Sequence, residues 1–231
     1  MWLVIIPLTH WAIPPGADRA MTAGRKTPNE PVDDWTRAHA IRTGMFWAIT
    51  LTVAANSLVF TGLAFHQISI LGEAGLSPTR AAANFLPQTV ASVGALSFAG
   101  VLAHRLPGRA MIALSMALLA LAALTLLFLD DSWITVVYAL LLGSAAGTGF
   151  ASEGVLYPRY FGVKSIASIR GLAFTVSVAA AAVGPILVGV SYQATGGYSL
   201  AAGLLTLIPI AVGILIVIVR APTPPPAAEA A

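Results

Sequence analysis

The chain has 231 residues, of which 58% are hydrophobic and 9% are charged, with a mean hydropathy of +0.86 and a formal net charge of +3. Soluble domains carry roughly 25% charged residues, so this composition excludes a water-soluble globular fold. The absence of cysteine excludes disulfides and thiolate metal sites.

The apolar residues are grouped in blocks of about 20, the length that a helix needs to cross about 30 Å of hydrocarbon. Strands of an outer-membrane barrel would instead alternate in polarity over about 10 residues. The sequence therefore predicts an all-α membrane protein, a bundle of six transmembrane helices in contact with the lipid bilayer.

The first stretch, residues 1–11, is apolar but too short to span, and Pro7 interrupts it. It lacks the preceding basic residues of a signal peptide, so we interpret it as the remnant of an earlier span. Residues 12–43 form a polar linker with several prolines and basic residues, which we expect to be mobile or loosely helical and to bury no core.

Six spans follow within residues 44–220, and the Pro-rich tail 221–231 is expected to be disordered. The spans are predicted at residues 44–71, 81–103, 109–129, 133–156, 171–192 and 200–219.

The distribution of basic residues predicts the orientation of these spans. Six crossings place eleven of the twelve Lys and Arg residues on the side of the N-terminal linker, and only Arg80 on the other side. Under the positive-inside rule, both termini are then cytoplasmic in a multi-pass protein of the plasma (inner) membrane. The same asymmetry explains the basic charge without nucleic acid as a partner.

Polar residues distinguish the spans from one another. The third and sixth contain no Asn, Gln or His and no charge within their apolar cores, so they can face lipid all round. The first, second and fourth carry polar groups, which are costly in hydrocarbon unless they face the bundle interior or water. We expect these three spans to surround an internal polar surface. The polar side chains concerned are Asn56, His66, Gln67, Asn84, Gln88 and Glu153.

Each polar residue has a functional and a structural interpretation. Glu153 is a candidate for proton coupling or a gate ion pair, or else an interfacial charge paired with a nearby arginine such as Arg159 or Arg109. His66 and Gln67 either bind substrate or carry a proton, or they lie at the outer headgroup level.

Asn56, Asn84 and Gln88 are candidates for lining a substrate cavity, with hydrogen bonding between helices as the alternative. Small residues predict close helix packing in two spans. In the fourth span, Gly143, Gly147 and Ala151 share four-residue spacing. The fifth span contains Gly184-Pro185 and Gly189, which are typical of a kinked or closely packed helix.

Three stretches carry a family resemblance. GLAFHQISILGEAGLSPTRAAA (62–83) and RYFGVKSIASIRG (159–171) resemble segments of monocarboxylate and oxalate/formate-type members of the major facilitator superfamily. GVLAHRLPGR (100–109) resembles the loop signature G-x-x-x-D-R-x-G-R of that superfamily, although His104 replaces the acid and one extra residue precedes Gly108. The residues that carry the loop motif are Gly100, Arg105, Gly108 and Arg109, together with Arg159 of the second stretch.

The resemblance implies spans seven to twelve of such a transporter, or one half of its fold. It implies alternating access by a secondary active transporter, which moves a small organic solute, a carboxylate in these members. Protons are one candidate for the coupling ion. In that family the first and fourth spans of each half line the cavity, while the third and sixth are peripheral. The chain would then be a fragment that pairs with a missing N-terminal half or with a second copy.

Other function classes find little support. The sequence contains no HExxH, GxSxG, P-loop or nucleotide-binding fingerprint, so we expect neither an enzyme nor a cofactor. The four histidines lie in separate segments and predict no metal site. The alternative function is a non-transporting membrane protein, such as a truncated pseudogene product or a sensor.

Overall fold

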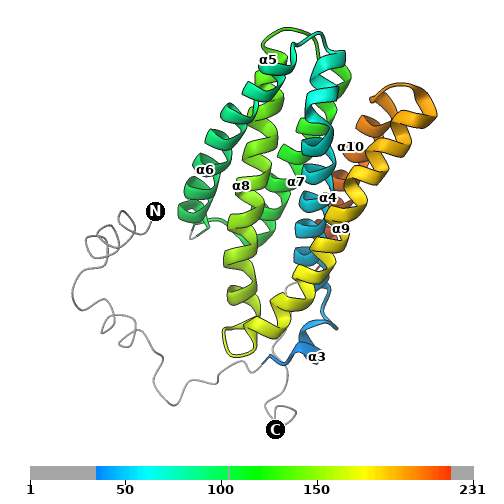
Figure 1. Cartoon of the computed structure of the whole chain (residues 1–231). Coiled ribbons are helices and arrows are strands. Elements are labelled where there is room, and N and C mark those ends of the chain that lie inside the picture. The colour runs from blue at the N-terminus through cyan, green and yellow to red at the C-terminus, as the bar shows by residue number, and fades with distance from the viewer. Residues whose placement is uncertain (1–34, 104, 220–231) are drawn as a thin grey trace, which may run out of the picture. The chain divides into compact units, whose positions relative to one another are not determined.

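The computed structural model describes residues 35–103 and 105–219, and within them the regular elements are helices (Figure 1). Six helical segments among the described residues are long and apolar enough to cross a membrane. The chain is thus an all-α, multi-pass membrane protein, as its composition predicts. The helices are α3 (Arg37–Ala40), α4 (Gly44–Glu73), α5 (Pro78–Ala83), α6 (Phe85–Leu102), α7 (Gly108–Thr125), α8 (Ile134–Phe161), α9 (Ile166–Thr195) and α10 (Ser199–Ile218), with a 3₁₀ turn at Leu126–Phe128 after α7.

Helices α4 and α8 form the centre of the bundle. α8 packs against α6 and α7, α4 packs against α9, and α10 packs against α7 (Figure 1). Each span contains an apolar stretch of 18 residues. Of these residues, 56% are buried in α4 and 61% in α8, but only 11% in the α5–α6 span. The first and fourth spans therefore form the interior, and α6 and α9 leave most of their surface uncovered.

Glycines let α8 approach α6 closely. A Cβ atom added to Gly143 would overlap the Gln88 carbonyl oxygen, and one added to Gly147 would overlap that of Ser92. One turn further along α8, Ala151 packs with Ala99 of α6. The close-packing face predicted from the four-residue spacing is confirmed.

A second close approach joins α4 to α9. A Cβ added to Gly184 would overlap the Leu58 carbonyl oxygen, and one added to Gly62 would lie 2.9 Å from the Gly184 carbonyl oxygen. Gly184 is the residue before Pro185, which lies inside α9. The small residues of the fifth span therefore serve helix packing, as predicted.

The two ends of the bundle differ in charge. The end at which α4 begins and α8 ends carries Arg105, Arg109, Arg159, Lys164 and Arg170, and we call it the basic end. At the opposite end Arg80 forms an ion pair with Asp131, with 2.6 Å between Nη1 and Oδ1.

The end of the linker is more ordered than its composition predicts. Trp35 is only 4% exposed, and its ring meets that of Phe161 edge-on at 5.2 Å between centroids. Thr43 then caps α4, because its hydroxyl accepts a hydrogen bond from the Phe46 amide. The expectation that residues 12–43 bury no core is wrong for this last part, where an aromatic residue reaches the bundle. The predictions for residues 1–11, 12–34, His104 and 221–231 concern residues outside the described part of the chain.

The third span does not face lipid all round. Ile112, Met116 and Leu119 of α7 are buried in the main core cluster of the bundle, and α7 packs against both α8 and α10. An apolar sequence does not distinguish a core face from a lipid face, because both are equally hydrophobic.

Candidate functional site

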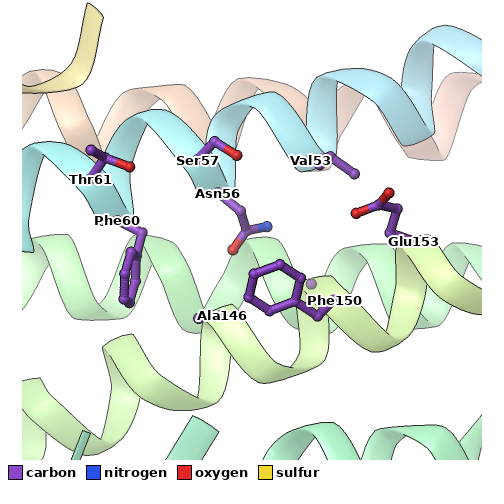
Figure 2. A pocket seen from close by; sticks show the side chains of 9 residues that line it. Val53, Asn56, Ser57, Phe60, Thr61, Ala146, Phe150 and Glu153 are labelled. Atoms are coloured by element: carbon purple, nitrogen blue, oxygen red, sulfur yellow. The ribbon is translucent and has the colours of Figure 1, made fainter. Parts of the chain in front are cut away.

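A pocket of about 140 Å³ opens between α4 and α8 (Figure 2). It lies between the two most buried spans, and both helices contribute side chains at helical spacing. Its lining residues are Val53, Asn56, Ser57, Phe60 and Thr61 of α4, and Ala146, Gly149, Phe150 and Glu153 of α8.

Helical geometry explains this set. Positions three and four apart lie on one face of a helix, which gives 53, 56/57 and 60/61 on α4 and 146, 149/150 and 153 on α8. Ala146 and Gly149 are small, so the α8 wall leaves room beside the Asn56 amide. A Cβ on Gly149 would lie only 3.0 Å from Cγ of Asn56.

Asn56 is the most constrained polar group of the pocket. Its Nδ2 donates to the Thr52 carbonyl oxygen at 3.1 Å and to Ser115 Oγ of α7 at 3.1 Å. Both donors of the amide are thereby used, and the carbonyl of Thr52 fixes which way the amide faces. Among the described residues, the buried Oδ1 atom has no hydrogen-bond partner. The site thus holds an acceptor that the bundle itself does not satisfy.

Glu153 lies at the basic side of the pocket and is paired with α9. Nη2 of Arg170 donates to Oε1 of Glu153 at 2.9 Å, and the glutamate side chain is 17% exposed. The expectation that Glu153 pairs with a nearby arginine is confirmed, but the partner is Arg170 and not Arg159 or Arg109. Arg170 lies within α9, which begins at Ile166, and one helical face of α9 brings it back over α8.

Hydroxyl groups complete the polar lining. Ser57 Oγ and Ser177 Oγ of α9 are 2.6 Å apart, so this bond joins α4 to α9 beside the pocket. Thr61 lies one turn further along α4 and is partly exposed. Figure 2 shows that Asn56 and Phe60 project from α4 toward α8, where Phe150 lies. Ser57 and Thr61 are pocket residues that were not predicted, although their spacing around Asn56 could have indicated them.

His66 and Gln67 lie on α4 away from this pocket. Gln67 is fully buried, and among the described residues neither of its amide atoms has a hydrogen-bond partner. Nδ1 of His66 lies 3.1 Å from the Gly62 carbonyl oxygen, and its ring lies 6.2 Å from that of Tyr198.

Asn84 and Gln88 face α8 and do not line the pocket. Nδ2 of Asn84 donates to the Thr135 carbonyl oxygen at 3.0 Å, which is a hydrogen bond between helices. Gln88 is 4% exposed, and its backbone lies against Gly143. The internal polar surface expected between three spans is thus a pocket between α4 and α8, while Asn84 and Gln88 pack against α8.

The loop-motif residues lie together at the basic end. Nη1 of Arg159 donates to the carbonyl oxygens of Ala103 and Leu106, at 3.5 and 3.2 Å, and so binds the backbone of the α6–α7 loop. Gly108 is buried, and a Cβ there would lie 2.7 Å from Leu156 and Tyr160. Arg105 and Arg109 are exposed, and Gly100 has open space at its Cβ position.

Over residues 35–103 and 105–219 no group of three or more His, Cys, Asp or Glu side chains is arranged to hold a metal ion. Comparison of the sequence with protein-family models and with curated proteins gives no match. The function is therefore inferred from the arrangement of the site. It brings together hydroxyl groups, one paired carboxylate and one buried amide oxygen that has no partner among the described residues, inside a membrane-spanning bundle.

Proposed function

We propose that the chain is one six-helix half of a secondary active transporter of the major facilitator type, which moves a small organic solute by alternating access. The observation that carries this proposal is the pocket between α4 and α8, which Asn56, Ser57, Thr61 and Glu153 help to line, inside a bundle whose outer surface is apolar. Polar groups within a membrane are costly and mark solute or ion pathways when they line a cavity.

The ion pair between Glu153 and Arg170 supports a gate at the basic end. It joins α8 to α9 beside the pocket, so breaking it would allow these helices to separate on that side. In our proposal this end is cytoplasmic, the membrane is the plasma (inner) membrane, and protonation of Glu153 couples solute movement to a proton gradient. The protein would then have no enzymatic activity.

In our proposal the solute is a carboxylate, as the family resemblance implies. None of the residues that line the pocket is Lys or Arg, so the cation that balances a carboxylate would come from the other half. That half is either a separate six-span segment or a second copy of the chain. The weakly buried surface of α9 is the face available for it.

Uptake into proteoliposomes tests the proposal. The chain is reconstituted as expressed and, in a second set, with the polypeptide encoded upstream of it, and labelled monocarboxylates are offered under a proton gradient. We expect uptake that falls about tenfold or more in Glu153→Gln and in Asn56→Leu, a loss of at least ~1.4 kcal/mol. Thr206→Ala is the matched control, because its hydroxyl bonds only within α10, to the Ala202 carbonyl oxygen. Absence of gradient-driven uptake in both sets would favour a non-transporting membrane protein.

A further inference from the structure

A groove of about 350 Å³ lies between α6 and α7, separate from the pocket described above. α6 and α7 each pack against α8, which forms the floor of the groove. The lining residues are Gly94, Ala95, Phe98, Ala99 and Leu102 of α6, Leu114 and Leu118 of α7, and Ser144 and Thr148 of α8.

The groove is open and apolar. Gly94 has no atom within 4 Å of its Cβ position, and Phe98 is 69% exposed. From Gly94 to Leu102 the α6 wall runs for about 12 Å at 1.5 Å per residue. In a membrane-spanning bundle, a groove of this length and character on the outer surface fits a hydrocarbon chain.

The groove ends at a basic loop. Leu102 is the last residue of α6, and the backbone amide of Arg105 donates to its carbonyl oxygen at 2.9 Å, which keeps Arg105 beside the end of the groove. The Arg105 side chain is exposed. Arg159 binds the same loop through two backbone carbonyl oxygens, so a second guanidinium lies at this point.

We propose that the groove between α6 and α7 binds an anionic phospholipid, with one acyl chain along α6 and the phosphate at Arg105. An apolar channel that ends at arginines is complementary to an acyl chain that ends at a phosphate. Juxtamembrane Lys and Arg residues attract anionic lipids by about 1 kcal/mol each, a preference that a zwitterionic lipid does not share. The site requires only the membrane bundle and is independent of transport.

The chain offers matched controls for both parts of the site. Arg109 is also exposed at the basic end, but it shares a helical face with Ala113, Met116 and Ala120, which line a different groove, next to α10. Gly203, in the interior of α10, has open space at its Cβ position just as Gly94 does. Gly203→Leu therefore controls for the loss of a helical glycine, and Arg109→Gln for the loss of a charge.

Native mass spectrometry of the purified chain with phosphatidylglycerol or phosphatidylcholine tests the site. We expect preferential retention of phosphatidylglycerol, which Arg105→Gln weakens about fivefold and Arg109→Gln leaves unchanged. Gly94→Leu should reduce binding of both lipids, whereas Gly203→Leu should not. Equal retention of the two lipids by the unmodified chain, or equal effects of the two arginine substitutions, would overturn the proposal. So would cross-linking of a Gly94→Cys variant to a second copy, because a protein neighbour would then occupy the groove.

Discussion

The guanidinium of Arg170 lies 2.9 Å from the carboxylate of Glu153 and joins the first turns of α9 to the second half of α8. The two side chains are unequally exposed, 44% for Arg170 and 17% for Glu153. Removing Arg170 therefore leaves a largely buried carboxylate without its partner, whereas removing Glu153 leaves a half-exposed guanidinium.

Arg170→Gln should consequently destabilise the bundle more than Glu153→Gln does. We expect a loss of about 1–2 kcal/mol for Arg170→Gln, because a largely buried carboxylate loses its partner, and less than about 1 kcal/mol for Glu153→Gln. Thermal unfolding in detergent, followed by circular dichroism, measures both. A larger loss for Glu153→Gln would show that the carboxylate is better solvated than the structure indicates.

Two buried tyrosines of α8 provide a second prediction. The hydroxyl of Tyr157 lies 2.9 Å from Thr50 Oγ1 of α4, whereas that of Tyr138 has no hydrogen-bond partner among the described residues. Tyr157→Phe should cost about 0.5–1.5 kcal/mol, because it breaks a bond between helices. Tyr138→Phe should be neutral or stabilising, because it removes a buried polar atom without a partner.

The same unfolding measurement compares the two tyrosine variants. Each substitution removes one oxygen atom from the unmodified chain, and both lie on α8. The interpretation fails if Tyr138→Phe is as destabilising as Tyr157→Phe. That result would mean that the Tyr138 hydroxyl bonds a group, such as an ordered water, inside the bundle.

Glycine substitutions test the close helix contacts. Gly143→Ala places a methyl group on the Gln88 carbonyl oxygen, and Gly184→Ala places one on that of Leu58. Each should destabilise the bundle by about 1–3 kcal/mol through overpacking. Gly154→Ala in α8 and Gly171→Ala in α9 are controls, because nothing lies within 4 Å of either Cβ position. These controls should be neutral or slightly stabilising, since alanine favours helix over glycine by about 1 kcal/mol; if all four variants behaved alike, the contacts would be looser than described.

The existence and number of spans could be predicted from the sequence, because blocks of apolar residues report the thickness of the bilayer directly. Their ends could not. The fourth span was predicted to end at residue 156 and the fifth to begin at residue 171, but α8 continues to Phe161 and α9 begins at Ile166. The additional turns carry Pro158, Arg159 and Arg170, which a hydropathy pattern excludes although a helix accommodates them at a membrane surface.

This difference also explains why the sequence pattern does not indicate Arg170 as the partner of Glu153. The pattern places Arg170 in a loop, where no helical face brings it back to α8. Arg159 instead binds the α6–α7 loop. Asn56 was identified as a cavity residue from its polarity alone, and it does line the pocket. Asn84 is equally polar but bonds α8, because which face of a helix meets its neighbour depends on packing that one sequence does not specify.

The absence of cysteine allows a direct test of the pocket between α4 and α8. A single cysteine is introduced at Thr61, which lines the pocket, or at Leu207, which is 61% exposed on the apolar surface of α10. Membranes are then treated with a water-soluble maleimide, with and without candidate solutes. The account predicts that Thr61→Cys is modified and that a transported solute protects it, while Leu207→Cys stays unmodified in lipid. Equal, low reactivity at both positions would contradict a water-accessible solute site between α4 and α8.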